Sequence, residues 1–371
     1  MSAKPRLLVL TPDFPPARGG IQVLAHRLAG GLQGFQTKVV SRDSSGARQF
    51  DAAGGLTVRR VRADKRLGGG RNLPLDAVAV LEAFRFRPHA TLSVHLVTSP
   101  AAALIHRTLG APTLQYFHAK EVGAKPRLAA FAARQAQDVI AVSDYTSQLV
   151  AATGAFSADV HLISPGVDIP VDTEPLPESR PTFLTIARLE DRYKGHDVLI
   201  RALPLIRAKV PDVHWVVIGD GPLRTGLEQL AHSHGVADAV SFLGALSDEE
   251  RNAWLRRAHL LSMPSRLPAG GFAGEGFGIV YLEAAAYGKP VVAGNVAGAL
   301  DAVVHRETGL LVDPTDPLAV AEAITRLLLD PDLARRLGAA GTRRAQEFAW
   351  PKVCARVEAV LLNRLGLPSV A

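Results

Sequence analysis

The sequence predicts an α/β protein of two domains, each a doubly wound parallel sheet covered by helices on both faces. Three observations lead to this prediction. Short runs rich in Val, Leu and Ile alternate with longer segments of helical period in both halves of the chain, as is typical of buried parallel sheets. The 371 residues exceed what one hydrophobic core usually holds. A proline-rich stretch without apolar periodicity interrupts the alternation near the middle.

The first half contains apolar runs that predict strands and two longer segments that predict helices. The expected strands cover residues 6–10, 37–40, 56–61, 90–94, 112–117 and 138–142, and the expected helices cover residues 21–31 and 73–86. In the second of these helices, Ala77, Val80, Leu81 and Phe84 recur at helical spacing and define an apolar face.

Residues 164–181 are interpreted as the interdomain linker, because five prolines and several acidic residues occur there. The alternation then resumes, with expected strands at 183–187, 213–218, 240–243, 260–263 and 291–293, and expected helices at 317–329, 332–348 and 353–365. Trp350 and Pro351 are expected to interrupt the helical pattern before the last helix. We therefore expect domains at residues 1–165 and 166–351.

Composition narrows the class of protein. With 47% hydrophobic and 21% charged residues, the chain is neither disordered nor collagen-like. Cys354 is the only cysteine, which excludes an intramolecular disulfide and a zinc site of clustered thiolates, and favours a reducing, cytosolic compartment. No apolar run approaches the roughly 18 residues of a membrane-spanning helix. We expect a protein that is soluble or lies on a membrane.

Positive charge is concentrated in the first half, where residues 1–165 carry a net charge of +10 against −3 for the remainder. Six cations fall within 13 residues against Asp64 alone: Arg59, Arg60, Arg62, Lys65, Arg66 and Arg71. Each cation near anionic lipid contributes about 1 kcal/mol, so the stretch predicts reversible membrane contact, with a solvated loop as the alternative. Nucleic acid is not an expected partner, because few aromatic residues accompany these charges.

Ligands of open parallel sheets bind at the carboxyl ends of the strands, and we expect a cleft between two facing sheets. After the first expected strand, Gly19 and Gly20 precede a helix. Their backbone can approach a ligand closely, and the free N–H groups of the helix start favour an anion. Asp13 in the same turn is a candidate for orienting a hydroxyl group. The alternatives are a simple glycine turn and an aspartate bonded to its own backbone.

Two cations follow the first expected strand of the second domain. Arg188 and Lys194 lie six residues apart across a loop and are candidates to straddle a diphosphate, with Arg as a fork and Lys as a point charge. Arg192 lies between them and competes for the same role. Solvated surface charges are the alternative.

The stretch from 263 to 294 is the most informative part of the sequence. Glu275 lies in a glycine-rich loop, where its carboxylate can accept hydrogen bonds from sugar hydroxyls. A helix is expected to start near Gly278, so the amides of Phe277, Gly278 and Ile279 can face a phosphate or a hydroxyl. Glu283 is a candidate to hold a ribose diol; a helix-cap role for Glu275 and a solvated Glu283 are the alternatives.

Together and in this order, these motifs resemble the retaining family 4 glycosyltransferases, which have two Rossmann-like domains, the GT-B fold. Glu275-Gly-Phe-Gly-Ile-Val-Tyr-Leu-Glu283 resembles the family signature, and Arg188 with Lys194 resembles its diphosphate-binding pair. Residues 13–22 and the Gly-Gly insertion before Glu275 look most like the phosphatidylinositol mannosyltransferases, particularly those adding the second mannose. Ala187 stands where many members have glycine.

The resemblance implies a hexosyltransferase that retains the anomeric configuration and uses a nucleoside diphosphate sugar, with GDP-mannose favoured and no metal or other cofactor. His118 ends an expected strand, and by the resemblance it would contact the transferred sugar and assist the attack of the acceptor. A structural histidine is the alternative. The resemblance also implies that a C-terminal helix at 352–371 completes the first domain.

Two further patterns are interpreted without cofactors. Gly219 and Gly221 suggest a dinucleotide fingerprint, but the next glycine breaks the required spacing, so we expect a turn near the nucleotide of the donor and no nicotinamide. Asp330-Pro331-Asp332 has the form of a metal-binding motif. Because it lies between two expected helices, we interpret it as a helix cap.

We expect a cytoplasmic enzyme, peripheral on the inner face of the membrane and a monomer or weak dimer, that transfers mannose to an anionic lipid or glycolipid acceptor. The departing phosphate would take the acceptor proton, since no residue stands out as a covalent nucleophile. One alternative is a soluble transferase of glucose or N-acetylglucosamine acting on a small molecule or polysaccharide, or a nucleotide-sugar epimerase of the same fold. The other is a non-catalytic sugar-nucleotide- or lipid-binding protein.

Overall fold

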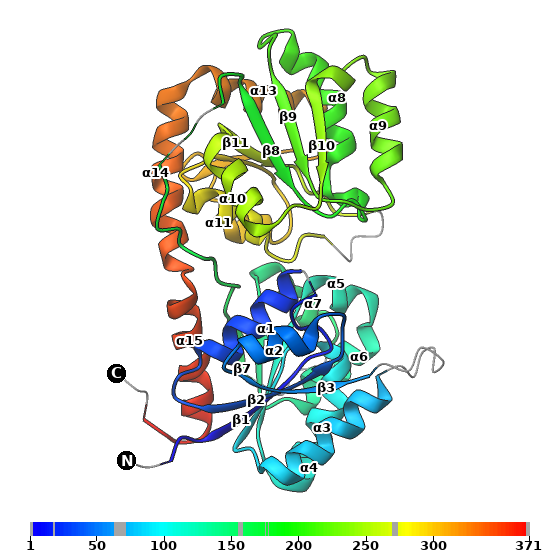
Figure 1. Ribbon diagram of the computed structural model, residues 1–371, viewed down its shortest axis with the longest axis vertical. Coiled ribbons are helices and arrows are strands. Elements are labelled where there is room, and N and C mark those ends of the chain that lie inside the picture. Colours follow the sequence, from blue (N-terminus) through cyan, green and yellow to red (C-terminus); the bar gives the residue numbers. More distant parts are fainter. Residues whose placement is uncertain are drawn as a thin grey trace. The chain divides into compact units, whose positions relative to one another are not determined.

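The computed structural model describes residues 3–17, 19–62, 72–154, 159–174, 176, 178–268 and 274–368. The chain divides into two compact units (Figure 1). Unit 1 comprises Met1–Gly166 and Trp350–Ala371, and unit 2 comprises Val167–Ala349. Each unit is a sheet with helices on both faces, so the predicted α/β class with two doubly wound parallel sheets is confirmed.

In the described part of unit 1, seven parallel strands form a sheet of order β3-β2-β1-β4-β5-β6-β7. Its strands are β1 (Arg6–Leu10), β2 (Gln36–Arg42), β3 (Thr57–Val61), β4 (Ala90–Ser93), β5 (Thr113–Phe117), β6 (Asp138–Ala141) and β7 (Asp159–Leu162). Its helices are α1 (Gly20–Gly31), α2 (Ala47–Ala53), α3 (Leu73–Phe86), α4 (Ser99–Leu109), α5 (Ala119–Ala124), α6 (Pro126–Gln135), α7 (Asp144–Ala151) and α15 (Trp350–Arg364).

Alternation along β1 explains why unit 1 has helices on both faces. Leu7 and Val9 lie in a core with residues of α1 and α15, whereas Leu8 and Leu10 lie in a second core with residues of α3 and α4. Successive side chains of a strand point to opposite faces, so a strand that is apolar throughout needs cover on both sides. Figure 1 shows α15 beside α1, although the two helices come from opposite ends of the chain.

In unit 2, the described residues form a six-stranded parallel sheet of order β10-β9-β8-β11-β12-β13. Its strands are β8 (Thr182–Ile186), β9 (His214–Ile218), β10 (Val240–Gly244), β11 (Leu260–Met263), β12 (Val291–Gly294) and β13 (Gly309–Val312). Its helices are α8 (His196–Arg207), α9 (Arg224–Ser233), α10 (Asp248–Arg257), α11 (Ile279–Ala286), α12 (Ala299–Ala302), α13 (Pro317–Leu329) and α14 (Pro331–Glu347). Buried Trp215 stacks on Phe183 at 5.7 Å between ring centroids and anchors one face.

Two short strands, β7 and β13, were absent from the sequence prediction, because four residues at a sheet edge carry little periodic signal. The last helix begins at Trp350 rather than after it. Pro351 lies in its first turn, where a missing N–H breaks no helical hydrogen bond. The prediction that Asp330 is a cap is confirmed: its side chain accepts from the Leu333 amide at 2.9 Å.

Helix α3 buries a face that differs from the predicted one. Leu75, Ala79 and Ala83 are buried against the sheet, and of the predicted face only Val80 packs partly buried beside them. Leu73, Ala77, Leu81 and Phe84 face solvent, and Leu73, Leu81 and Phe84 are 64%, 48% and 43% exposed. Among the described residues, no helix combines the length and the apolar character needed to cross a membrane.

Candidate active site

In unit 2, the chain direction places the candidate residues at the carboxyl ends of the central strands. Strand β8 pairs with β9 on one side and with β11 on the other, so the strand order reverses at β8. Loops after strands that flank such a reversal separate and leave a crevice for ligands. Arg188 follows β8, Gly219 follows β9 and Glu275 lies in the loop after β11.

Lys194 and Glu275 form an ion pair between the loop after β8 and the loop after β11, with Lys194 Nζ donating to Glu275 Oε2. Their side chains are only 16% and 13% exposed. Burial lowers the pKa of Lys194, but the charge and hydrogen bond of Glu275, together with Tyr193 and Asp191, act in the opposite direction. The net effect raises the pKa of Lys194 above its usual value. The pair therefore presents a fixed cation and a fixed carboxylate at the edge of one sheet.

The other cations of this loop are more exposed. The Arg188 side chain is 64% exposed and makes a 3.4 Å ion pair with Glu190. Arg192, in the short 3-10 helix Arg192–Lys194, is exposed. An exposed cation pays little desolvation before it meets an anionic ligand, so Arg188 remains available to a diphosphate.

The turn after β9 lies directly against the turn after β8. A Cβ atom added at Gly219 would lie 1.9 Å from the Ala187 carbonyl oxygen, and one added at Gly221 would lie 2.5 Å from that of Leu189. The Leu189 amide donates to the Asp220 carbonyl at 2.9 Å. Gly219 and Gly221 are therefore required for this close approach, beside the loop that carries Arg188.

Gly278 is the N-cap residue of helix α11 and has the left-handed conformation, with φ of 88°. Phe277 is buried beneath this turn, and Ile279 is the first helical residue. Glu283, one turn further on, lies 3.5 Å from Arg251 of α10. Burial raises the pKa of Glu283, although Arg251 acts in the opposite direction. Glu283 is thus a partly buried, paired carboxylate and not a solvated one.

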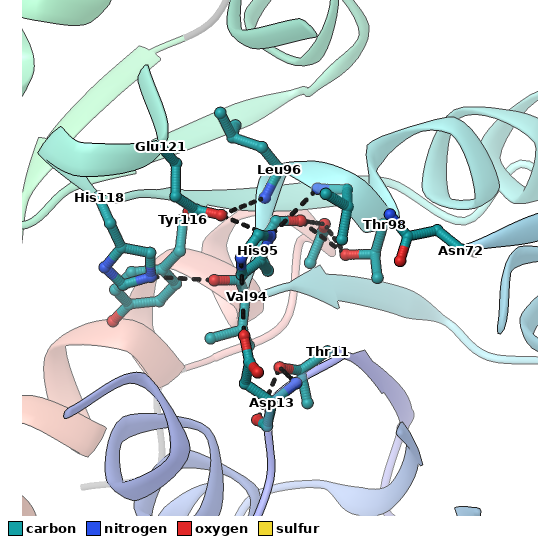
Figure 2. A network of polar contacts seen from close by, with 12 residues as sticks. Thr11, Asp13, Asn72, Val94, His95, Leu96, Thr98, Tyr116, His118 and Glu121 are labelled. Carbon is teal, nitrogen blue, oxygen red and sulfur yellow. Dashed lines mark hydrogen bonds and ion pairs between the residues drawn. The ribbon is translucent and has the colours of Figure 1, made fainter. Parts of the chain in front are cut away.

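In unit 1, three neighbouring central strands end in polar side chains. Asp13 follows β1, His95 follows β4 and His118 follows β5, and the order β2-β1-β4-β5 reverses at β1. Figure 2 shows these side chains converging from the three strand ends. Asp13 Oδ2 lies 3.6 Å from His95 Nε2, so its carboxylate points to a neighbouring strand end.

His118 is held by the turn that follows β4. Its Nε2 lies 3.0 Å from the Val94 carbonyl oxygen. Burial lowers the pKa of His118 below its usual value, although the carboxylates of Glu121 and Asp13 act in the opposite direction. A neutral imidazole has one N–H group, which donates to Val94 and leaves Nδ1 as an acceptor. The His118 carbonyl already accepts the Glu121 and Val122 amides of α5.

His95 and Glu121 were not singled out from the sequence. His95 Nδ1 lies 2.5 Å from Glu121 Oε1, and Figure 2 shows His95 with Glu121 on one side and Asp13 on the other. His95 follows a strand whose position next to β1 is known only from the sheet order. The signal available in the sequence is the position of His95 directly after an expected strand, which the structure shows to be fully buried.

Of the remaining predicted residues, some lie where the sequence predicts and others do not. Gly19 precedes α1 with φ of 153°, and Gly20 is its first residue, so both lie at the carboxyl end of β1.

Arg60 is not a surface cation: its guanidinium turns inward to Asp51 at 2.8 Å and to the Arg42 carbonyl at 3.1 Å. Its assignment to membrane contact was therefore wrong.

The other predicted membrane contacts are only partly described. Arg59 is 56% exposed and Arg62 is exposed. Lys65, Arg66 and Arg71 lie outside the described residues. Within the described ranges, no cluster of three or more His, Cys, Asp or Glu side chains could hold a metal ion.

Two family models together match most of the chain. Residues 171–344 match the model described as "Glycosyl transferases group 1", and residues 18–170 match "Glycosyltransferase Family 4". The chain is 35% identical to a GDP-mannose-dependent alpha-(1-6)-phosphatidylinositol monomannoside mannosyltransferase of Mycobacterium tuberculosis, over 95% of this chain and 97% of that protein. It is 34% identical to the protein of the same description in Mycolicibacterium smegmatis, over 96% and 98%.

Solved structures share the fold. Sucrose-phosphate synthase from Thermosynechococcus elongatus superposes with a TM-score of 0.82 at 22% identity, covering 98% of this chain and 99% of that one. HepE of Anabaena, solved in complex with UDP, gives a TM-score of 0.81 at 21% identity, covering 96% and 100%. At these identities the likeness shows the fold alone.

Proposed function

This chain belongs to the family 4 glycosyltransferases of the GT-B fold, and on that premise we propose that it transfers mannose from GDP-mannose to a phosphatidylinositol mannoside. It is a hexosyltransferase. The mycobacterial relatives named above support the donor and the acceptor, since they match nearly the whole chain. The observation that carries the proposal is the buried ion pair between Lys194 and Glu275.

Departure of a nucleoside diphosphate leaves negative charge on a phosphate oxygen and positive character on the sugar. Lys194 and Arg188 would stabilise the first of these charges, together with the amides that open α11 around Gly278. Glu275 would accept hydrogen bonds from sugar hydroxyls and fix the angle of attack. Preorganised charges of this kind contribute several kcal/mol to catalysis, because they need no reorganisation during the reaction.

We propose further that the anomeric configuration is retained and that neither a metal nor another cofactor takes part. The acceptor hydroxyl attacks on the face from which the diphosphate departs, and the departing phosphate oxygen takes its proton. Glu275 is unsuited to covalent attack while it is paired with Lys194. Glu283, one turn into α11, would hold the ribose diol of the nucleotide.

Peripheral contact with a membrane follows from the nature of this acceptor, and α3 supports it. The four outward residues of α3, Leu73, Ala77, Leu81 and Phe84, form a stripe along one face, hereafter the α3 stripe. Three exposed cations lie near it: Arg85 and Arg87 on or just after α3, and Arg59 on the neighbouring β3. An apolar stripe with flanking cations is the pattern of a surface that rests in lipid headgroups.

A transfer assay tests the proposed function. GDP-[14C]mannose is supplied to the purified protein with vesicles containing phosphatidylinositol monomannoside, and labelled lipid is measured. We expect label in the lipid, and none when UDP-glucose or UDP-N-acetylglucosamine replaces the donor. Transfer only to a soluble acceptor would refute the lipid assignment. Nucleotide binding without turnover of any donor would favour a non-catalytic binding protein.

A further inference from the structure

The geometry of unit 1 assigns a role to two residues that no sequence motif contains. Glu121, His95 and Asp13 lie in a row: Glu121 Oε1 is 2.5 Å from His95 Nδ1, and His95 Nε2 is 3.6 Å from Asp13 Oδ2 (Figure 2). One imidazole thus connects two carboxylates through its two ring nitrogens. The row runs from the start of α5, across the end of β4, to the end of β1.

Exposure increases along this row. The side chains of Glu121, His95 and Asp13 are 9%, 17% and 32% exposed. Asp13 is therefore the end of the row that a ligand can reach, whereas Glu121 is the end anchored in the protein. A buried carboxylate that holds a histidine, whose other nitrogen faces outward, is an arrangement that fixes the ring and its tautomer.

Glu121 is poorly explained as a stabilising residue. Its Oε2 atom is buried and has no hydrogen-bond partner among the described residues. A buried polar atom without a partner costs about 1–3 kcal/mol, and such costs persist where function requires them. Its Oε1 atom accepts the contact from His95 and a long bond from the Leu96 amide at 3.4 Å.

The proton between His95 and Glu121 can be assigned by distance. The Val97 amide nitrogen also lies 3.2 Å from His95 Nδ1, and a nitrogen that carries hydrogen cannot accept this bond. The 2.5 Å contact with Glu121 is much the shorter, and two electronegative atoms so close must share a proton. Nδ1–H therefore donates to Glu121. Nε2 faces the Asp13 carboxylate, and it can hold that group only with a proton of its own, in the doubly protonated ring.

We propose that His95, held by Glu121 and carrying a proton on both ring nitrogens, is a positioning residue that orients the Asp13 carboxylate toward the attacking hydroxyl of the acceptor. Asp13 accepts a hydrogen bond from that hydroxyl, and the proton still leaves with the departing phosphate. His118 fits the same arrangement, because its Nε2–H is bonded to Val94, next to His95. Its free Nδ1 then accepts from a hydroxyl of the transferred sugar.

This inference rests on the proposed function, so its test separates transfer to the acceptor from hydrolysis of the donor by water. Both rates are measured from GDP-mannose, with phosphatidylinositol monomannoside vesicles and without them. His95→Ala is expected to lower the ratio of transfer to hydrolysis about tenfold and to raise the KM for the acceptor, as loss of one hydrogen bond to a charged group predicts. Glu121→Gln, which keeps the shape of the side chain, is expected to lower the ratio in the same direction.

Two further variants make the test specific. His95→Gln retains an N–H donor and should recover part of the ratio that His95→Ala loses. His161→Gln is the matched control, because His161 also pairs with a buried carboxylate in unit 1, with Nε2 3.1 Å from Asp138 Oδ1. It is expected to leave the ratio within about twofold of the wild type, as a change at a partly exposed pair should.

The outcomes are distinguishable from failure of the proposed function. If wild-type protein transfers mannose and His95→Ala lowers transfer and hydrolysis in the same proportion, His95 is merely structural and the inference is overturned. An unchanged ratio in both His95→Ala and Glu121→Gln also overturns it. If the wild-type protein neither transfers nor hydrolyses GDP-mannose, the proposed function itself fails.

Discussion

The carboxylate of Glu275 forms an ion pair with the ammonium group of Lys194, although 81 residues separate them in the chain. Neither side chain is more than about one sixth exposed. Two charges that are largely removed from water must satisfy each other or a ligand. Replacement of either residue therefore leaves the charge of the other largely buried and without this partner, and the effect on stability and activity can be measured.

Glu275→Ala is expected to lower the rate of transfer by about 100-fold or more, because the sugar loses the carboxylate that orients it. The variant should also lose about 1–3 kcal/mol of unfolding free energy, since Lys194 keeps its charge without this partner. Steady-state kinetics and urea unfolding measure the two effects. Glu228→Ala, at a surface ion pair with Arg224, should change stability by less than about 0.5 kcal/mol. Wild-type turnover in folded Glu275→Ala would remove the residue from the site.

Lys194→Ala is expected to weaken GDP binding about tenfold or more, because a charged contact to phosphate is worth roughly 1.5–3 kcal/mol. Arg192→Ala is the matched control: Arg192 is a cation of the same loop but is exposed, so its loss should change the affinity about twofold at most. Isothermal titration calorimetry gives both values. A larger loss in Arg192→Ala would reverse the assignment between these two cations.

Gly278→Ala is expected to reduce stability by about 1–3 kcal/mol and to impair donor binding. The position has a φ of 88°, and an added Cβ would lie 2.4 Å from the Tyr281 ring, so the α11 start must shift. Gly226→Ala in α9 is the control, since nothing lies within 4 Å of its added Cβ. In that helix alanine should stabilise by up to about 1 kcal/mol. Thermal unfolding that ranks the variants the other way would contradict this account.

Leu81→Glu in the α3 stripe is expected to reduce binding to vesicles of phosphatidylglycerol and phosphatidylcholine about tenfold, because it replaces apolar contact with a repelled charge. Leu205→Glu on α8 of unit 2 is the control, since Leu205 is 43% exposed, close to the 48% of Leu81. Cosedimentation measures the bound fraction. Equal losses in the two variants would argue against the α3 stripe as the contact surface.

Asp76, in the first turn of α3, should make stability depend on pH. Burial raises its pKa to about 6, although Arg42 acts in the opposite direction. The folded state therefore holds a proton that the unfolded chain releases near pH 4, and stability falls as the pH rises between these values. After allowance for partial exposure, Asp76→Asn should stabilise by about 1 kcal/mol at pH 7, and by less at pH 4. A constant difference between wild type and variant across that range would show that Asp76 keeps its ordinary pKa.

Periodicity was enough to find the long elements. Residues 6–10, 73–86, 260–263 and 317–329 were predicted with the bounds that the structure has, because continuous apolar runs and 3.6-residue periods are local signals. The edge strands β7 and β13 are short, and pairing with a neighbour defines them more than their own residues do. The role of Pro351 depended on where its helix began, which a pattern locates only to within a few residues.

The sequence by itself determined the α/β class, the family and the strand ends at which Asp13, Arg188 and His118 would be found, since these depend on local order along the chain. Only the tertiary structure decided that Glu121 and Asp13 would contact the two ring nitrogens of His95, that Arg60 would turn inward, and that Leu81 would face solvent. The reason is physical: strand order and helix rotation are set by packing between segments that are distant in the chain. No spacing within one segment records which distant side chain will be its neighbour.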